Sequence, residues 1–422
     1  MSPASAPSTP STVTPWLLRW QGLFADTVPG PLSSKLSLLS GIVLCALMVG
    51  LPLVTRGGLS LLILAAGLLW LLWALRTPAG PIRGISGWLL LLLGIALLAT
   101  GFSPVPVAAF KGLLKLVSYL GVYALMRQLL AEAPQWWNRI VAALLAGELF
   151  SAVQAIRQLY GDTSELARWA DPNSVADGTI RVYGPLENPN LLAGYLIPIL
   201  PLALVAMLRW RSWPQRLFAA AALVLGSSAL FLSYSRGGWL GMVAALGVTV
   251  LLLVLRQTRS WPTLWRRLFP LLLISAAVAA LVVAVTQIEP LRIRVLSLVA
   301  GRADSSNNFR INVWLAAIDM VQARPWLGIG PGNAAFNLIY PLYQQPKFNA
   351  LSAYSVPLEL LVEGGVPYLL AGLGLLLASI RAGWTHLKGE SSWAATALTI
   401  AARASAERSI TAAPWGSPSR AS

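Results

Sequence analysis

The stretch Ser233–Trp239, with the sequence SYSRGGW, decides how the chain around it folds. Arg236 is the only charged residue between an apolar run that ends near Phe231 and another that begins at Trp239. Two membrane-spanning helices joined by so short a turn hold the guanidinium at a membrane surface, because a charge within lipid is costly without an anionic partner or water. The stretch therefore predicts a membrane protein that holds positive groups at one face.

The composition places the whole chain in the membrane class. Hydrophobic residues make up 56% of the 422 residues and charged residues 11%, whereas soluble domains are about one quarter charged. Lipid satisfies no backbone polar groups, which excludes open strands, and barrel strands would be shorter and alternating. We expect an all-α polytopic membrane protein with about ten transmembrane helices, each near the ~20 apolar residues that a bilayer requires. The expected spans are Leu36–Thr55, Leu59–Leu75, Ile85–Thr100, Val107–Met126, Ile140–Ile156, Leu191–Leu208, Leu217–Tyr234, Trp239–Leu255, Leu271–Thr286 and Ser355–Ile380.

The net charge of +16 is distributed unevenly between the connecting loops. One set of short loops carries most of the arginines, and the alternate short loops carry only Arg56 and Arg236. This asymmetry follows the positive-inside rule and predicts a multi-pass protein of the bacterial inner (plasma) membrane with both termini in the cytoplasm. Because no basic patch is interleaved with aromatic residues, we expect no nucleic-acid partner. The arginine-rich loops contain Arg76, Arg83, Arg127, Arg139, Arg209, Arg211, Arg216, Arg256, Arg259, Arg266 and Arg267.

The expected spans divide the chain into three parts. Residues 1–35 are expected to be a cytoplasmic segment, residues 36–380 the transmembrane domain and residues 381–422 a cytoplasmic tail. The tail, rich in Ala, Ser, Thr and Arg, is expected to be a truncated or frame-shifted end of a longer membrane protein. Two longer loops, 157–190 and 287–354, are expected outside the membrane.

The second loop contains an amphipathic pattern. Apolar residues recur at helical spacing after Ser306-Asn307-Asn308, which could cap a helix, and Arg324-Pro325 ends the pattern. This helix could lie at the outer interface or pack on the membrane body. The glycine-rich stretch Trp326–Gly332 (WLGIGPG) lacks the Lys-Ser or Lys-Thr of a phosphate-binding loop, so we expect a tight turn. The apolar positions are Ile311, Trp314, Leu315, Ile318 and Val321.

The rarest residue types limit the chemistry. Cys45 is the only cysteine and His386 the only histidine, and the latter lies in the tail. No disulfide framework or thiolate metal site can be built, and we expect neither a metal nor another cofactor. Histidine catalysis is absent from the membrane body.

An anion-binding site is expected at the start of the sixth span. Asn190 can cap this helix, and a helix N-terminus that faces outward favours anions. Arg181 lies nine residues upstream and could fold over the same end. Arg181 and Arg236 could then grip one planar oxyanion or a diphosphate through paired donors. Alternatively, both arginines pair with loop carboxylates such as Asp177 or Glu187.

A second group of charges lies within the spans. Lys111 and Lys115 are four residues apart in the fourth span, as are Glu359 and Glu363 in the tenth, and Glu148 lies within the fifth. A spacing of four puts each pair on one helix face. Since buried charges in lipid pair or line a wet cavity, we expect a Lys/Glu cluster between the fourth and tenth spans. Alternatively, all four side chains reach the nearest interface.

Several motifs follow one another in a characteristic order. They are Arg181-Val-Tyr-Gly with Asn188-Pro-Asn, Ser235-Arg-Gly, Arg310 with Trp314, Pro325–Gly332, and Tyr354-Ser355 with Gly365 and Tyr368. At these residues the chain resembles the O-antigen ligase and polymerase proteins of bacterial envelopes. Within that superfamily, residues 16–380 look like the cyanobacterial inorganic-carbon-transport group, named for bicarbonate uptake. The strings that carry this closer likeness begin at Asp171, Arg302 and Ile339.

The resemblance implies two functions and leaves a third open. The first is bicarbonate transport, with the anion held by Arg181 and Arg236. Against it, Pro198 and Pro201 interrupt only one span, whereas secondary transporters contain paired broken helices. The second is transfer of a glycan from a polyprenyl diphosphate in the membrane lipid, with Arg310 joining the two arginines at the diphosphate. The third is a non-catalytic partner that modulates another transporter.

The superfamily's presumed base is replaced in this chain. The resemblance places a histidine, which would activate the acceptor hydroxyl, at the position of Tyr354. A tyrosine with a pKa near ~10 is a poor base at neutral pH. Asp177, Asp304 or Glu289 would have to take over the role, and the sequence does not choose among them.

Overall fold

The computed structural model describes residues 31–76, 84–161, 181–287 and 301–388, together with a few positions between 289 and 296. Predictions for residues 1–30, for Asp177 and for the tail beyond residue 388 lie outside these ranges. Within them, every regular element is helical. The α-helices are α2 (Pro31–Gly50), α3 (Arg56–Arg76), α4 (Ile85–Gly101), α5 (Pro106–Glu132), α6 (Trp136–Arg157), α7 (Pro189–Leu196), α8 (Ile199–Arg209), α9 (Trp213–Leu232), α10 (Arg236–Gln257), α11 (Thr263–Gln287), α13 (Ser305–Ala323), α14 (Asn333–Ile339) and α15 (Val356–Lys388). Short 3-10 turns are η1 (Gln158–Tyr160), η3 (Gly184–Leu186), η4 (Thr258–Ser260), η5 (Gly301–Ala303) and η6 (Tyr340–Leu342).

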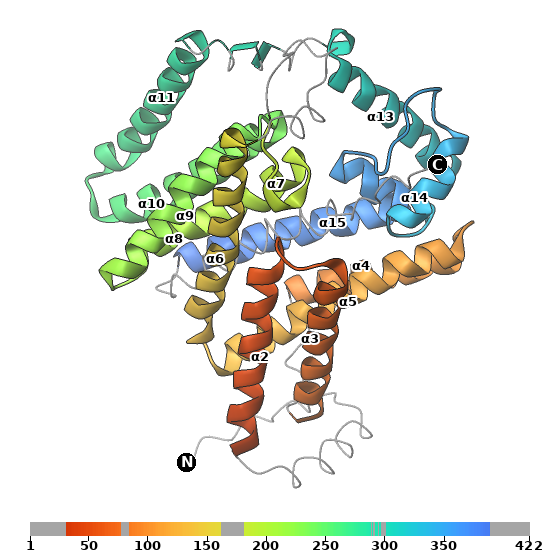
Figure 1. The fold of residues 1–422 in the computed structure, drawn as a ribbon, viewed down its shortest axis with the longest axis horizontal. Coiled ribbons are helices and arrows are strands. Elements are labelled where there is room, and N and C mark those ends of the chain that lie inside the picture. The colour runs from red at the N-terminus through yellow and green to blue at the C-terminus, as the bar shows by residue number, and fades with distance from the viewer. Residues whose placement is uncertain are drawn as a thin grey trace, which may run out of the picture.

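Many of the described helices are long enough to cross a membrane (Figure 1). Seven candidate spans are long and apolar enough to cross a bilayer: α3, α5, α6, α7 with α8, α9, α10 and α15. Helices α2 and α4 are shorter apolar helices, and α11 is a further apolar helix of 25 residues. Large apolar side chains point outward, as with Leu61 and Leu64 of α3, which are 67% and 59% exposed. Such a surface requires lipid around it, and the all-α polytopic membrane fold is confirmed.

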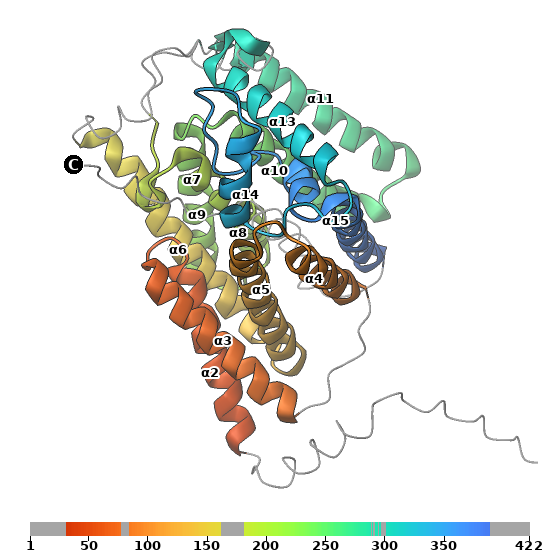
Figure 2. The ribbon, with the colours of Figure 1, turned by 90° about the vertical axis from the view of Figure 1, so that its right-hand side faces the viewer.

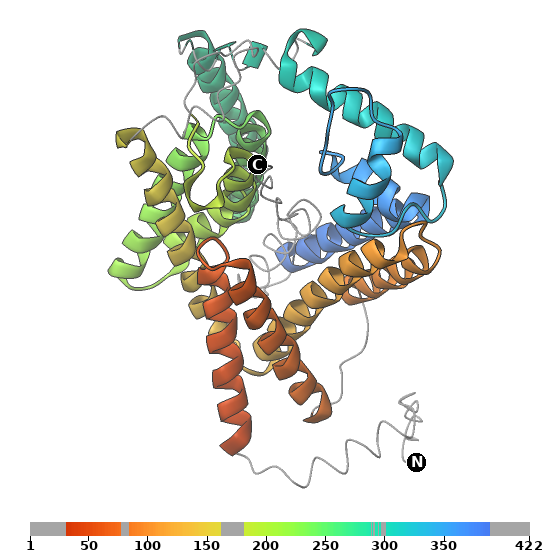
Figure 3. The same ribbon diagram turned by 45° about the vertical axis from the view of Figure 1, so that its right-hand side comes forward.

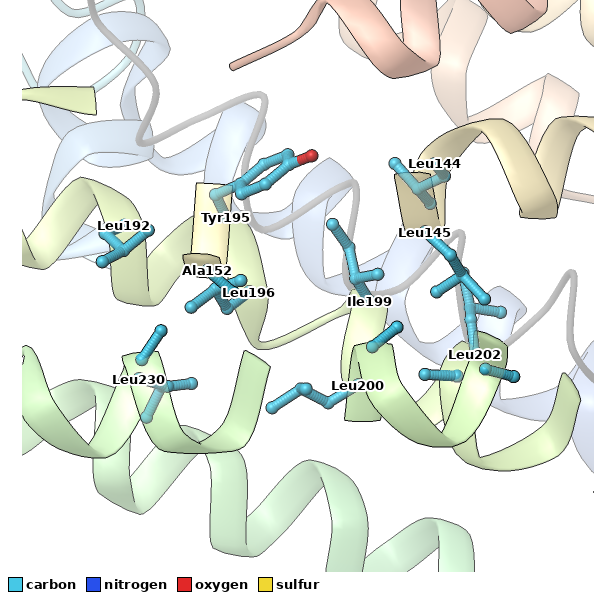
Figure 4. Packing of buried hydrophobic residues seen from close by; sticks show 14 of the residues in the cluster. Leu144, Leu145, Ala152, Leu192, Tyr195, Leu196, Ile199, Leu200, Leu202 and Leu230 are labelled. Carbon is cyan, nitrogen blue, oxygen red and sulfur yellow. The ribbon is translucent and has the colours of Figure 1, made fainter. Parts of the chain in front are cut away.

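Four groups of buried side chains hold the bundle together. Helices α2 and α3 lie side by side and pack with α5 and the start of α6 (Figures 2 and 3). A larger leucine-rich cluster joins α6, α7, α8 and α9 (Figure 4). Helix α4 packs along α15, while α13 and α14 pack on the starts of α5 and α15. The cluster that α13 and α14 form with the starts of α5 and α15 places this part of the second predicted loop (287–354) on the membrane body.

Two of the spans are interrupted. Helix α7 ends at Leu196 and α8 begins at Ile199, where Pro198 and Pro201 have no N–H to donate to the preceding turn. From the sequence, this span was expected to be the only interrupted one. Helix α15 is also broken, because Gly365 has a φ of 71° and a ψ of −168° inside it. The expectation of a single interrupted span was therefore wrong.

The glycine-rich stretch Trp326–Gly332 closes the break in α15. Ile329 N–H donates to the Val362 carbonyl and Gly330 N–H to the Glu363 carbonyl, each over 2.9 Å. In return, Val366 N–H donates to the Pro325 carbonyl over 2.8 Å. These bonds satisfy backbone groups that the break would otherwise leave bare within an apolar environment. The stretch is thus a turn packed against a helix, in agreement with the turn interpretation.

This contact requires glycine on both sides. Gly328, Gly330 and Gly332 have φ values of 59°, 96° and 93°, which side chains with a Cβ atom rarely adopt. Gly112 of α5 lies against the same stretch, and a Cβ atom at this position would overlap the Pro331 carbonyl. Close backbone packing therefore fixes α5 and α15 to the stretch.

Adding one methyl group at Gly112 tests this packing. We expect Gly112→Ala to lower the free energy of unfolding by roughly 1–3 kcal/mol, because the added methyl group meets backbone atoms of Pro331 and Gly332, which cannot move aside as a side chain could. Thermal unfolding in detergent measures the change. Gly94→Ala in α4 is the control, since an added Cβ atom meets nothing within 4 Å there. Equal melting temperatures for Gly112→Ala and the control would contradict the packing account.

Candidate functional site

Four helix starts meet at one end of the bundle. Ser235, which caps α10, donates its hydroxyl to Asn190 Oδ1 of α7 over 2.9 Å. Arg236 of α10 pairs with Asp304, which caps α13, and Phe309 of α13 packs against Tyr354, two residues before α15. Helix starts carry unbonded N–H groups and partial positive charge. The candidate site at this end comprises Arg181, Asn190, Arg236, Asp304, Arg310 and Tyr354.

The segment that carries Arg181 is fixed by the ends of two spans. Gln158 Oε1, just after α6, accepts hydrogen bonds from the N–H groups of Tyr183 and Gly184, both over 3.0 Å. Val182 N–H donates to the carbonyl of Leu232, the last residue of α9, over 3.3 Å. Arg181 is therefore placed by backbone pairing, and no sequence pattern had singled out Gln158.

Arg181 connects to α10 through Asn190. Its Nε atom donates to the Ser233 carbonyl over 3.0 Å and its Nη2 atom to Asn190 Oδ1 over 3.1 Å. Asn190 Oδ1 also accepts the Ser235 hydroxyl. Ser235 was missed as a site residue, although a serine directly before a helix is a common cap.

Asn190 does not cap α7, so that prediction was wrong. The cap is Asn188, whose Oδ1 atom accepts from the N–H groups of Asn190 and Leu191 over 2.8 and 3.3 Å. Pro189 occupies the first helical position, where its fixed φ and missing N–H suit the helix. The residue before the proline therefore caps the helix, and the Asn190 side chain remains for Arg181 and Ser235.

Arg236 forms an ion pair with Asp304. Its Nη2 atom lies 2.9 Å from Asp304 Oδ1, and the two side chains are 9% and 0% exposed. The same Oδ1 atom accepts Asn307 N–H over 3.0 Å and so caps α13. The predicted cap at Ser306-Asn307-Asn308 was thus placed too late. Arg236 does have a carboxylate partner, and this partner comes from the second loop rather than the first.

Arg310 lies beside this ion pair without an acid of its own. In the described part of the chain, its half-buried guanidinium makes no hydrogen bond or ion pair. Burial and the neighbouring Arg236 lower the pKa of Arg310 from its usual value, against the opposite effects of Tyr354 and Asp304. A guanidinium nonetheless stays charged in proteins. Arg310 is therefore a cation with hydrogen-bond donors available to a ligand.

Tyr354 borders Arg310 and retains its phenolic proton. Burial raises its pKa, and Glu359 adds to this effect, while a backbone hydrogen bond with Leu351 and the charge of Arg310 oppose it. Its ring meets Phe309 of α13 edge to face, with 5.7 Å between centroids. At neutral pH the hydroxyl can donate a hydrogen bond but is a poor general base.

Backbone strain marks the same end of the bundle. Glu187, Tyr234 and Tyr354 have φ values of 57°, 48° and 49°, in the left-handed region that non-glycine residues avoid. Each lies two residues before the start of α7, α10 or α15. Strain of about 1–2 kcal/mol per residue persists only where the surroundings enforce it, often at binding sites. Exposed Glu187 forms no ion pair with Arg181 or Arg236 in the described structure.

The Lys/Glu positions come together only in part. Glu363 accepts Gly332 N–H through Oε1 over 2.8 Å and interacts electrostatically with Lys115 and Glu359. Lys111 is exposed on α5, and no ion pair joins it to either glutamate in the described residues. The Lys/Glu cluster therefore remains a prediction. Across the described ranges, no three His, Cys, Asp or Glu side chains are grouped as metal ligands would be.

The ion pair yields a stability prediction. Asp304→Asn keeps an oxygen to cap α13 but leaves Arg236 without its anion, so we expect the free energy of unfolding to fall by about 3–5 kcal/mol. Arg236→Gln combined with Asp304→Asn should recover much of this loss, because no buried charge is left uncompensated. Asp319→Asn, on the exposed side of the same helix, is the control. Thermal unfolding in detergent measures these changes. If the double variant loses as much stability as the two single variants together, the two residues are not coupled.

Comparison with known proteins adds a family likeness. Residues 221–373, less than half of the chain, match the O-antigen ligase family. No curated protein matches the chain. The matched region contains Arg236, Asp304, Arg310 and Tyr354, whereas Arg181 and Asn190 precede it. The part of the chain that supplies the ion pair and Arg310 is therefore similar to O-antigen ligases.

Proposed function

We propose that this membrane protein binds a polyprenyl-diphosphate-linked glycan at the candidate site and transfers the glycan to an acceptor hydroxyl. The observation that carries the proposal is Arg310, a half-buried guanidinium without an ion pair in the described chain, beside the Arg236–Asp304 pair. The match of residues 221–373 to O-antigen ligases supports glycan transfer as the chemistry.

The charges of the site favour a strongly anionic ligand. Arg181, Arg236 and Arg310 bring three positive charges, and of these Arg236 is paired with the carboxylate of Asp304. A diphosphate offers several oxygens that accept charge-assisted bonds, and guanidinium forks match phosphate geometry. As the glycan leaves, negative charge develops on the diphosphate, so the arginines would stabilise the transition state as well as the substrate.

The surface of α13 suits the prenyl chain. Trp314, Leu315 and Ile318 are 37%, 42% and 41% exposed, while Ala316 and Ala317 on the opposite side are buried against the bundle. Three of the five apolar positions identified in the sequence thus point outward from a packed helix, whereas Val321 packs against the buried cluster. An apolar stripe beside a polar site allows a lipid tail to remain in hydrocarbon while its diphosphate reaches the arginines.

The transfer step requires a proton acceptor. The acceptor oxygen attacks the anomeric carbon, the bond from that carbon to the diphosphate oxygen breaks, and the polyprenyl diphosphate leaves. The hydroxyl proton must pass to a base. Tyr354 retains its own proton, and Asp304 is bound to Arg236. Glu289 is exposed and lies 3.8 Å from Arg292, and Asp177 lies outside the described residues.

We assign the role of base to Glu359. This carboxyl group in the first turn of α15 is 4% exposed and interacts electrostatically with Tyr354. Within the described chain its side chain makes no hydrogen bond. Because burial favours the neutral carboxyl group, only its ionised form would accept the hydroxyl proton. Tyr354 would then orient the acceptor by donating a hydrogen bond.

Bicarbonate transport remains the alternative for the same cations. A small planar oxyanion could contact Arg310 without any lipid. The family match offers no support for such a substrate, since O-antigen ligases are named for glycan transfer. Competition between the two ligands separates the alternatives.

Binding of polyprenyl diphosphate to the purified protein in nanodiscs tests the proposal. We expect Arg310→Ala to weaken binding roughly ten- to a hundredfold, because hydrogen bonds to a charged group contribute ~1.5–3 kcal/mol. Arg56→Ala, which removes an equal charge from the start of α3, should bind like the wild type. Excess bicarbonate should displace little lipid. Displacement by bicarbonate, together with equal binding by Arg310→Ala, would contradict the proposal.

A second substitution addresses the transfer step. Glu359→Gln should lower the rate of glycan transfer by about 10²–10⁴-fold, because a general base contributes that much, while diphosphate affinity stays near the wild-type value. Release of polyprenyl diphosphate from a labelled donor reports the rate, and Glu132→Gln at the exposed end of α5 is the control. An unchanged rate in Glu359→Gln would exclude this residue as the base.

A further inference from the structure

Glu148, a residue outside the candidate site, has its carboxyl group enclosed among the packed helices. Glu148 lies in the interior of α6 and is 0% exposed. In the described structure neither Oε1 nor Oε2 has a hydrogen-bond partner. Asp304, the buried acid of the candidate site, has both an arginine and a backbone amide. Glu148 therefore differs from a structural ion pair.

The surroundings of Glu148 are apolar and shaped to hold it. Its Oε1 atom lies against Gly226 of α9, where an added Cβ atom would overlap it, and Leu200 of α8 borders the same point. Leu145 and Ala152 lie about one turn before and after it on α6, within the leucine-rich cluster (Figure 4). Gly226 thus leaves room for a carboxyl group but for little else.

No charge in the described structure compensates Glu148. Burial alone determines its electrostatic environment, and it forms no ion pair with any described residue. An ionised carboxylate without a partner would cost several kcal/mol in such surroundings. The titratable residues on α6 and on the neighbouring helices α2, α7, α8 and α9 are Lys35, Cys45, Arg139, Arg157, Tyr195, Arg209 and Arg216.

We propose that Glu148 is a proton-binding site inside the membrane, which holds its proton while α6, α8 and α9 are packed and releases it when they separate. Ionisable groups in the interior of membrane helices commonly mark proton or ion paths. The site is independent of the proposed glycan transfer, since it shares no residue with the candidate site.

The broken span supplies a movable element beside Glu148. Leu200 lies just after the junction of α7 and α8. Pro198 and Pro201 cannot donate to the carbonyls of Gly194 and Ile197, so this segment has fewer helix bonds to hold it. A displacement of α8 at the junction would open the carboxyl group to water, and loss of the proton would then become possible.

Carbodiimide labelling tests the protonated state directly. An apolar carbodiimide takes up the carboxyl proton on one nitrogen while the carboxyl oxygen adds to its central carbon, and acyl migration to nitrogen then fixes the adduct without a leaving group. In nanodiscs we expect labelling of Glu148 in the wild type at neutral pH, no labelling of exposed Glu132, and complete loss of the adduct in Glu148→Gln. An adduct at Glu148 that forms at about pH 5 but not at neutral pH, detected by peptide mass spectrometry, would show an accessible yet ionised group and would overturn the proposal.

The pH dependence of stability is a second test, and it does not require the carbodiimide to reach Glu148. Because only the neutral acid fits the packed helices, raising the pH from about 6 to about 10 should lower the melting temperature of the wild type more than that of Glu148→Gln. The glutamine keeps the shape and cannot ionise. Glu132→Gln should retain the wild-type dependence. Parallel curves for the wild type and Glu148→Gln would contradict proton binding at this position.

Discussion

The ion pair between Arg236 and Asp304 joins the two parts of the candidate site. It connects the first residue of α10 to the residue that caps α13, over a sequence separation of 68 residues. Asp304 Oδ1 is engaged by Arg236 and by the amide of Asn307, and in the described chain no ion pair joins Asp304 to Arg310. Asp304 thus pairs with Arg236 and caps α13, and Arg310 is left without an ion pair in the described chain.

The break in α15 places the remaining residues. The stretch Trp326–Gly332 connects α13 to α14 and at the same time pairs with the backbone exposed at Gly365. This contact fixes α13, which carries Arg310, relative to α15, whose first turn carries Glu359. Tyr354 lies between them, held by Phe309 on one side and strained in its backbone. Irregular backbone within a membrane protein is tolerated where protein covers it, and here it also brings two distant segments into register.

Much of the fold could be predicted because the signals are local. Long apolar runs indicate spans, and Arg324-Pro325 ends a helix in the sequence and in the structure alike. The partner of Arg236 could not be predicted, since no local pattern links residues so far apart. The cap of α7 was misplaced because asparagines flank Pro189 on both sides and only proline's preference for the first helical turn distinguishes them. The break at Gly365 was hidden in an apolar run that reads as one continuous span.

A structure of the protein in nanodiscs with polyprenyl diphosphate bound tests the central claim most directly. The account predicts phosphate oxygens within hydrogen-bond distance of the Arg310 guanidinium, with the Arg236–Asp304 pair intact beside them. A diphosphate bound elsewhere, or Arg310 paired with a carboxylate of the protein in the bound state, would contradict it.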